Sequence, residues 1–148
     1  MTEQTEPQRR IVVGVDGSPS SIDALSWAVD QARTRGAVIE ALTAWQYPVA
    51  TGWTLPMETG EDLAAIMRKV LDDAIAQATG AVGPIEIRPR VVQGGAASCL
   101  LEAAQGADLL VVGSRGHGGF VGALLGSVAG HCVQHAPCPV VVVRHSTH

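Results

Sequence analysis

Residues 11–19 read IVVGVDGSP, and this stretch decides the fold. The apolar run 11–15 is mostly β-branched, and such side chains favour extended backbone, so it predicts a short strand. The run stops at Asp16 and Gly17. Ser18 and Pro19, which come next, are residue types that cap and open a helix. A strand that passes through a tight turn into a helix is typical of the first half of a βαβ unit.

The alternation of strand and helix continues to the end of the chain. Apolar residues recur at helical spacing through 19–35, and Gly36 ends that helix. Periodicity and chain breakers predict the remaining elements. These are strand 38–44, helix 60–79 with a capping box at Thr59 and Asp62, strand 85–92, helix 97–104, strand 109–112, helix 127–135 and strand 139–144.

This order predicts an α/β domain built on a five-stranded parallel sheet. Short crossovers through helices require right-handed connections and place helices on both faces of the sheet. We expect the strand order 3-2-1-4-5. Ligands of such sheets bind at the carboxyl ends of the strands, near the point where the strand order reverses.

Composition narrows the function. The 148 residues suit one domain, and 47% hydrophobic with 16% charged residues is typical of a globular protein. No apolar run is long enough for a membrane span, and residues 1–9 predict a flexible polar tail without a secretory signal. A net charge of −4 and the lack of a basic cluster argue against nucleic-acid binding. We therefore expect a cytoplasmic protein.

The longest glycine-rich stretch follows the fourth predicted strand. Gly113 to Gly126 contains six glycines, and Gly126-Ser127 opens the last helix. Glycine lets the backbone approach a ligand, and a helix N-terminus offers N–H donors to anions. No carboxylate follows Asp108, which also suits an anionic ligand, although chance would explain that too. The stretch predicts a phosphate-binding loop, with a plain surface loop as the alternative.

Two common phosphate signatures are absent. The Walker pattern needs a lysine after its last glycine, and the one lysine of the chain, Lys69, falls in the second helix. The dinucleotide pattern G-x-G-x-x-G is missing after the first strand, where Gly14-Val15-Asp16-Gly17 stands instead. This disfavours NAD binding in its usual mode.

The spacing Gly113-x-x-Gly116, nine residues, then Gly126-Ser127 resembles the G-2x-G-9x-G-[ST] signature of the universal stress protein family. The resemblance covers about residues 9–144, from 12–18 through 107–116 to 138–143. It implies a Rossmann-like fold of the adenine nucleotide alpha hydrolase type over residues 10–148. It also implies a stress-response protein that binds ATP, with or without Mg²⁺.

The resemblance assigns roles by position. Asp16 would lie near the ribose, although a turn-forming role is an alternative, and the backbone of Ala44 would contact adenine. The glycines of the signature and Ser127 would hold the phosphates. The candidate binding set is Asp16, Gly17, Ser18, Ala44, Val112, Gly113, Arg115, Gly116, Gly126, Ser127 and Val128.

Other residues have weaker claims to a function. His131 and His135 are spaced as metal ligands on a helix, but no third ligand is apparent. Cys132 and Cys138 suit either redox chemistry or packing, and packing is the commoner role. Three function classes remain open: a regulatory nucleotide-binding module, a slow ATP hydrolase and a ligand-independent scaffold. Phosphoryl transfer needs more charge than one Arg and one His supply, which favours binding. The sequence does not decide between ATP and cyclic AMP.

The last strand predicts a homodimer. Residues 140–143 are four consecutive valines on an expected edge strand, where unpaired N–H and C=O groups invite pairing. Members of the family that the chain resembles commonly dimerise through this strand. The alternative is a monomer with the edge covered by residues 145–148. A proline at Val141 is expected to remove a donor from that edge.

Overall fold

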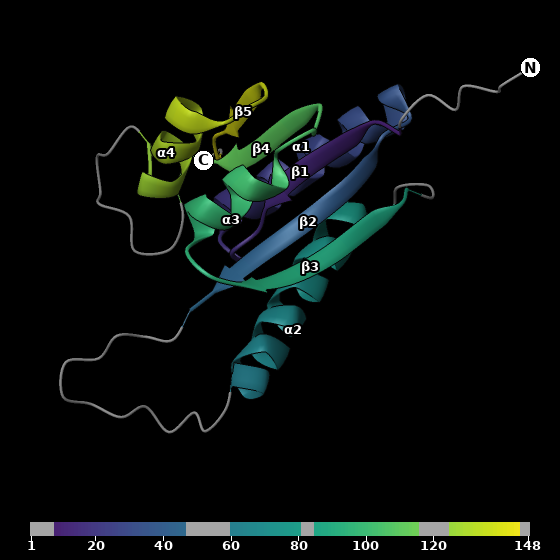
Figure 1. Ribbon diagram of the computed structural model, residues 1–148. Coiled ribbons are helices and arrows are strands. Elements are labelled where there is room, and N and C mark those ends of the chain that lie inside the picture. The colour runs from purple at the N-terminus through teal and green to yellow at the C-terminus, as the bar shows by residue number, and fades with distance from the viewer. Residues whose placement is uncertain (1–7, 47–59, 81–84, 116–124, 146–148) are drawn as a thin grey trace, which may run out of the picture.

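The computed structural model describes residues 8–46, 60–80, 85–115 and 125–145. Strands and helices alternate along these residues, as predicted (Figure 1). The elements are β1 (Arg10–Gly14), α1 (Pro19–Arg35), β2 (Val38–Trp45), α2 (Gly60–Thr79), β3 (Ile87–Gln93), α3 (Ala96–Ala103), β4 (Leu109–Gly113), α4 (Ser127–His135) and β5 (Val140–Val143).

The strands form one parallel sheet in the order β3-β2-β1-β4-β5, which confirms the predicted topology. β1 therefore lies between β2 and β4. The first two crossovers run from β1 towards the β3 edge, and the later ones run towards the β5 edge. The strand order thus reverses between β1 and β4, and a ligand site is expected at their carboxyl ends.

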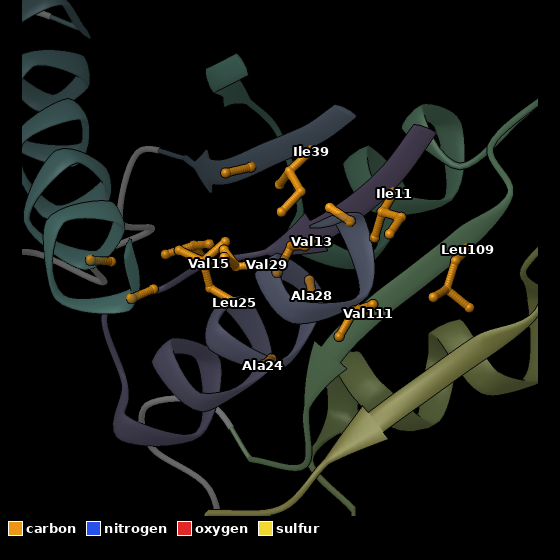
Figure 2. Packing of buried hydrophobic residues seen from close by; sticks show 14 of the residues in the cluster. Ile11, Val13, Val15, Ala24, Leu25, Ala28, Val29, Ile39, Leu109 and Val111 are labelled. Atoms are coloured by element: carbon orange, nitrogen blue, oxygen red, sulfur yellow. The ribbon is translucent and has the colours of Figure 1, made fainter. Parts of the chain in front are cut away.

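Each face of the sheet carries its own apolar core. On one face, alternate strand residues such as Val13 and Ile39 pack with Leu25 of α1 and Leu71 of α2 (Figure 2). On the other face, Val12, Leu42 and Val112 pack with residues of α3 and α4. In Figure 1, α3 and α4 lie in front of the sheet and α1 lies behind it. Helices therefore cover both faces, as the alternation predicted.

Local signals placed the ends of α1. Ser18 has extended backbone and its Oγ accepts the N–H of Ser21 at 3.3 Å, which caps the helix. Gly36 ends the helix in the left-handed region, with φ 67°. Both predictions are confirmed. The capping box predicted for α2 includes Thr59, which lies outside the described residues.

Several predicted boundaries were wrong by one or two residues. β3 begins at Ile87 rather than at residue 85, and β5 is shorter than residues 139–144. Arg9, the last residue of the predicted tail, is joined to the sheet, because its carbonyl accepts the N–H of Val38 at 2.9 Å. Strand ends follow the hydrogen bonds available from the neighbouring strand, which local sequence does not specify.

A buried carboxylate joins three strands. Glu40 of β2 is 8% exposed, and its carboxylate pairs with Arg10 of β1 at 2.9 Å and with Arg90 of β3. The Arg10 guanidinium also donates to the carbonyls of Ala103 and Gln105 at the end of α3. Buried charges persist only when they are paired. Arg10 therefore joins β1 to β2 and to the C-terminus of α3.

The hydrogen bonds of β5 show which of its residues face outward. The carbonyl of Pro139 accepts the N–H of Leu110 in β4 at 3.0 Å, and the carbonyl of Val143 accepts the N–H of Ser114, directly after β4, at 2.8 Å. Main-chain groups alternate sides along a strand. The N–H and C=O of Val141 therefore also point to β4, whereas those of Val140 and Val142 point to the open edge. The expectation that a proline at Val141 would alter the outer edge was wrong.

Within the described residues, no helix is long and apolar enough to cross a membrane.

Candidate functional site

The loops that follow β1 and β4 meet where the strand order reverses. Ser18 Oγ, in the first loop, lies 3.5 Å from the carbonyl oxygen of Arg115 in the second. The N–H of Arg115 in turn donates to Ser20 Oγ at 3.4 Å, although 95 residues separate them. Two segments that the sequence singled out separately therefore form one surface at the carboxyl end of the sheet.

Asp16 organises the first loop. Its Oδ1 accepts the N–H of Ser18 at 2.9 Å, and its own N–H donates to Ser21 Oγ at 3.3 Å. Gly17, between them, has φ 82°, a conformation that favours glycine. The turn-forming role proposed for Asp16 is thus present. The side chain is also exposed, so it lies at a surface that a ligand can reach.

The two helix N-termini near this surface differ. Ser18 caps α1, and the proline that follows has no N–H, so the first turn of α1 has few donors left for a ligand. The N-cap of α4 is Gly126, which has no side chain to accept the donors of the first turn, and that turn holds no acidic residue. Of these two helices, α4 therefore has the N-terminus better suited to an anion.

The ends of the glycine-rich stretch are tied together. The N–H of Gly126 donates to the carbonyl of Ser114 at 2.6 Å, which brings the start of α4 beside the end of β4. Gly113 packs directly on α1, since a Cβ there would lie 2.6 Å from Ser20 Oγ and 2.7 Å from the Ser20 carbonyl carbon. Gly113 is therefore required for close packing, in addition to any role toward a phosphate.

Ala44 and Val112 occupy different environments. Ala44 is half-buried in the part of β2 that extends beyond its pairing with β1, opposite Val92 of β3. It lies at the same end of the sheet as Asp16. Val112 is 3% exposed within the core on the α3 and α4 side. Its side chain serves packing, so a contact between Val112 and a ligand would involve its backbone.

Several predicted residues lie at the rim of the site. Arg115 and Ser127 are exposed, and Val128 and Gly126 are partly buried. Arg144, which directly follows β5, is exposed as well. Gly116 and the glycines at 118, 119 and 122 lie outside the described residues, so the signature is placed at its two ends.

The histidine pair and the cysteines were the other candidates for a functional site, and the structure gives them little support. The rings of His131 and His135 are 4.7 Å apart, but no group of three possible metal ligands occurs among the described residues. Burial raises the pKa of the Cys132 and Cys138 thiols above the ordinary value. A raised pKa leaves less thiolate at neutral pH, so these cysteines are poor nucleophiles.

Sequence reasoning missed two serines of the site. Ser20 and Ser114 are 5% and 7% exposed, and their hydroxyl oxygens are 3.4 Å apart. Thr43 was also missed, and its hydroxyl donates to the carbonyl of Val15 at 2.8 Å. The available signal was the run Ser18-Pro19-Ser20-Ser21 at the start of a predicted helix. Any of these hydroxyls that is buried needs a hydrogen-bond partner.

The arrangement agrees with comparisons to known proteins. The model of the Universal stress protein family matches residues 8–144. The chain belongs to this family. A universal stress protein of Mycolicibacterium smegmatis is 39% identical over 139 residues, which cover 90% of this chain and 45% of the relative. A universal stress protein of Mycobacterium tuberculosis (strain ATCC 25618 / H37Rv) is 34% identical over 142 residues, which cover 90% of this chain and 47% of the relative. The chain thus spans about half the length of these curated relatives.

Solved structures of the universal stress protein family share the fold. One universal stress protein, solved in complex with cAMP, is 31% identical with a TM-score of 0.72, over 95% of this chain and all of that one. A family protein from Arabidopsis thaliana, solved with AMP bound, is 19% identical with a TM-score of 0.61. The match covers 94% of this chain and 93% of that one. At that identity, the second likeness supports the fold alone.

Proposed function

We propose that this universal stress protein is a regulatory module that binds an adenine nucleotide, with ATP as the first candidate. The carrying observation is the meeting of the Asp16 loop, the Ser114–Arg115 backbone and the uncapped N-terminus of α4 where the strand order reverses. Such a site combines N–H donors with a carboxylate, which suits phosphates and a ribose respectively. The structure with cAMP, at 31% identity, supports the same ligand class.

Each part of the nucleotide has a matching part of the site. The phosphates would lie at the start of α4, against Gly126, Ser127 and the glycines outside the described residues. Asp16 would accept the ribose hydroxyls, and the backbone of Ala44 would meet adenine. The described residues hold no group of three possible metal ligands. Mg²⁺ would therefore bind mainly through the phosphates and water, as it does in many nucleotide sites.

Replacing Asp16 with alanine is the direct test. A hydrogen bond to a charged acceptor is worth roughly 1.5–3 kcal/mol, so ATP affinity should fall about 10- to 100-fold in calorimetry. Asp16→Asn should lose less, because it keeps an acceptor for the N–H of Ser18. 2′,3′-Dideoxy-ATP lacks the ribose hydroxyls, so its affinity should change little. Equal losses for both nucleotides would mean that Asp16 acts on the turn alone.

Cyclic AMP is a second candidate, because the 31% identical relative was solved with it. Its 3′ oxygen is esterified, so Asp16 has one ribose hydroxyl left to bind. Parallel titrations of the wild-type protein with ATP and cyclic AMP decide between them. Mass spectrometry of ligand released from denatured protein identifies what the protein carries when purified.

We expect ATP turnover below ~1 s⁻¹, the low end of the usual enzyme range. Fast phosphoryl transfer needs several cations around the phosphates and a positioned base. In the described part of the site the cations near the phosphate end are Arg115 and Arg144, and the sequence supplies no Walker lysine. A phosphate-release assay with purified protein measures the rate. A faster rate, lost in Asp16→Ala, would place the protein among the enzymes.

We also propose that the protein is a cytoplasmic homodimer, formed by antiparallel pairing of β5 with its symmetry mate. β5 is an edge strand, and its four valines are each half-buried within the single chain. In a monomer, residues 145–148 would cover this edge. His145, the one described residue among them, instead contacts α1, because its Nδ1 lies 2.5 Å from Asp23 Oδ2. A two-fold pairing of such edges is a common oligomeric solution.

The orientation of β5 dictates the variant that tests the dimer. Val142→Pro removes an N–H on the open edge, so it should convert a dimer to a folded monomer in light scattering. Val141→Pro, the matched control, removes an N–H that faces β4 and should lower stability instead. A wild-type monomer at micromolar concentration, or a Val142→Pro variant that stays fully dimeric, would refute the β5 dimer.

A further inference from the structure

Ser20 has a buried hydroxyl between the two loops of the site. It lies in the first turn of α1 and is 5% exposed. Its Oγ is within 3.4 Å of three groups: the carbonyl of Val143 at 3.3 Å, Ser114 Oγ at 3.4 Å and the N–H of Arg115 at 3.4 Å.

These contacts use the whole bonding capacity of one hydroxyl. A serine hydroxyl has one donor and two acceptor lone pairs. The proton can go to the Val143 carbonyl, and the lone pairs can accept the Arg115 N–H and the Ser114 hydroxyl proton. Ser20 therefore connects the end of β5, the end of β4 and the first described residues of the glycine-rich stretch.

Two serines, one in α1 and one at its N-cap, contact the main chain of Arg115. Ser20 accepts its N–H, while Ser18 Oγ lies 3.5 Å from its carbonyl oxygen. The approach is close because Gly113 lets the α1 backbone contact β4. The two peptide groups that flank the Cα of Arg115 are thus held by the side chains of Ser18 and Ser20 rather than by the sheet ladder.

We infer that Ser20 is a positioning residue that holds the Ser114–Arg115 peptide, near the start of the glycine-rich stretch, and so orients the stretch for phosphate binding. This inference rests on the proposed nucleotide site. Removing the hydroxyl leaves the main-chain bonds from Ser114 N–H to the Val143 carbonyl and from Gly126 N–H to the Ser114 carbonyl. The sheet and the start of α4 therefore remain in place, while Arg115 N–H loses an acceptor.

Ser20→Ala tests the inference, with Ser114→Ala as the matched control. The control removes one hydroxyl of the cluster but keeps both main-chain contacts of Ser20. In nucleotide-free protein, hydrogen exchange at the Arg115 amide should rise about tenfold in Ser20→Ala, as expected for loss of one hydrogen bond, and stay near wild type in Ser114→Ala. If Ser20→Ala does not fold, Ser20→Cys retains the volume with a weaker hydrogen-bonding group.

Calorimetry with ATP and with adenosine then separates positioning from folding. ATP affinity should fall about tenfold in Ser20→Ala, because the stretch proposed to hold its phosphates loses an anchor, while adenosine affinity is retained. Unchanged exchange at Arg115, unchanged ATP affinity or equal losses for both ligands would overturn the inference. Wild-type protein that binds neither ligand would refute the proposed function instead, and the exchange comparison alone would then decide whether Ser20 holds the stretch.

Discussion

Replacing Gly113 with alanine is expected to destabilise the protein by about 3 kcal/mol or more, because overpacking at a rigid contact cannot relax. The new Cβ would lie 2.6–2.8 Å from the Oγ, carbonyl carbon and carbonyl oxygen of Ser20. Two of these are backbone atoms in the first turn of α1. Neither β4 nor α1 can move away without breaking contacts in a core that is packed on both sides of the strand. Urea unfolding measures the loss as a lower midpoint.

Two other glycines provide matched controls. A Cβ at Gly130, inside α4, would meet nothing within 4 Å, so Gly130→Ala should stabilise the protein by about 1 kcal/mol through helix propensity. A Cβ at Gly14 would lie 2.8 Å from Leu100 Cδ1, the end of a flexible side chain. Gly14→Ala should therefore cost less than Gly113→Ala. A Gly113→Ala variant as stable as wild type would show that α1 and β4 are not in rigid contact.

Gly113 has a packing role that is separate from its place in the family signature. This first glycine of the signature is required by helix packing whether or not a phosphate lies near it. Loss of ATP binding in a Gly113 variant would therefore say little about phosphate contact. A test of the phosphate site therefore uses a change of charge at Gly116, the second glycine of the signature.

Gly116→Glu is expected to lower ATP affinity by at least about 100-fold, since a like charge at a binding site costs several kcal/mol. The added carboxylate follows Arg115 in the chain and stands in the stretch proposed to hold the phosphates. Adenosine has no phosphate charge, so its affinity should fall much less. Calorimetry with both ligands measures the two effects.

Gly80→Glu is the matched control for Gly116→Glu. It makes the same change of charge at an exposed residue directly after α2, where a Cβ meets only the Gln77 carbonyl at 3.9 Å. ATP affinity should be nearly unchanged in this variant, because surface charges more than about 10 Å apart are screened by salt. If Gly116→Glu binds ATP as well as Gly80→Glu does, the phosphates do not lie at the glycine-rich stretch.

Much of the fold was predictable because its signals are local. The β-branched runs, the cap at Ser18 and the C-terminal glycine Gly36 each act within a few residues, so order and approximate bounds of the elements follow from the sequence. The candidate site was predictable as two separate loops. Their meeting followed from the rule that ligands bind where the strand order of a parallel sheet reverses.

The sequence by itself determined the order of strands and helices, the parallel sheet and the family. Tertiary structure alone decided which hydroxyl meets the Arg115 amide, why Gly113 has to be a glycine and which residues of β5 face outward. It also brought Arg10 and Arg90 to Glu40 from neighbouring strands. The physical reason is sequence separation: Ser20 and Arg115 are 95 residues apart, and strand register and helix placement, rather than local propensity, bring such groups together.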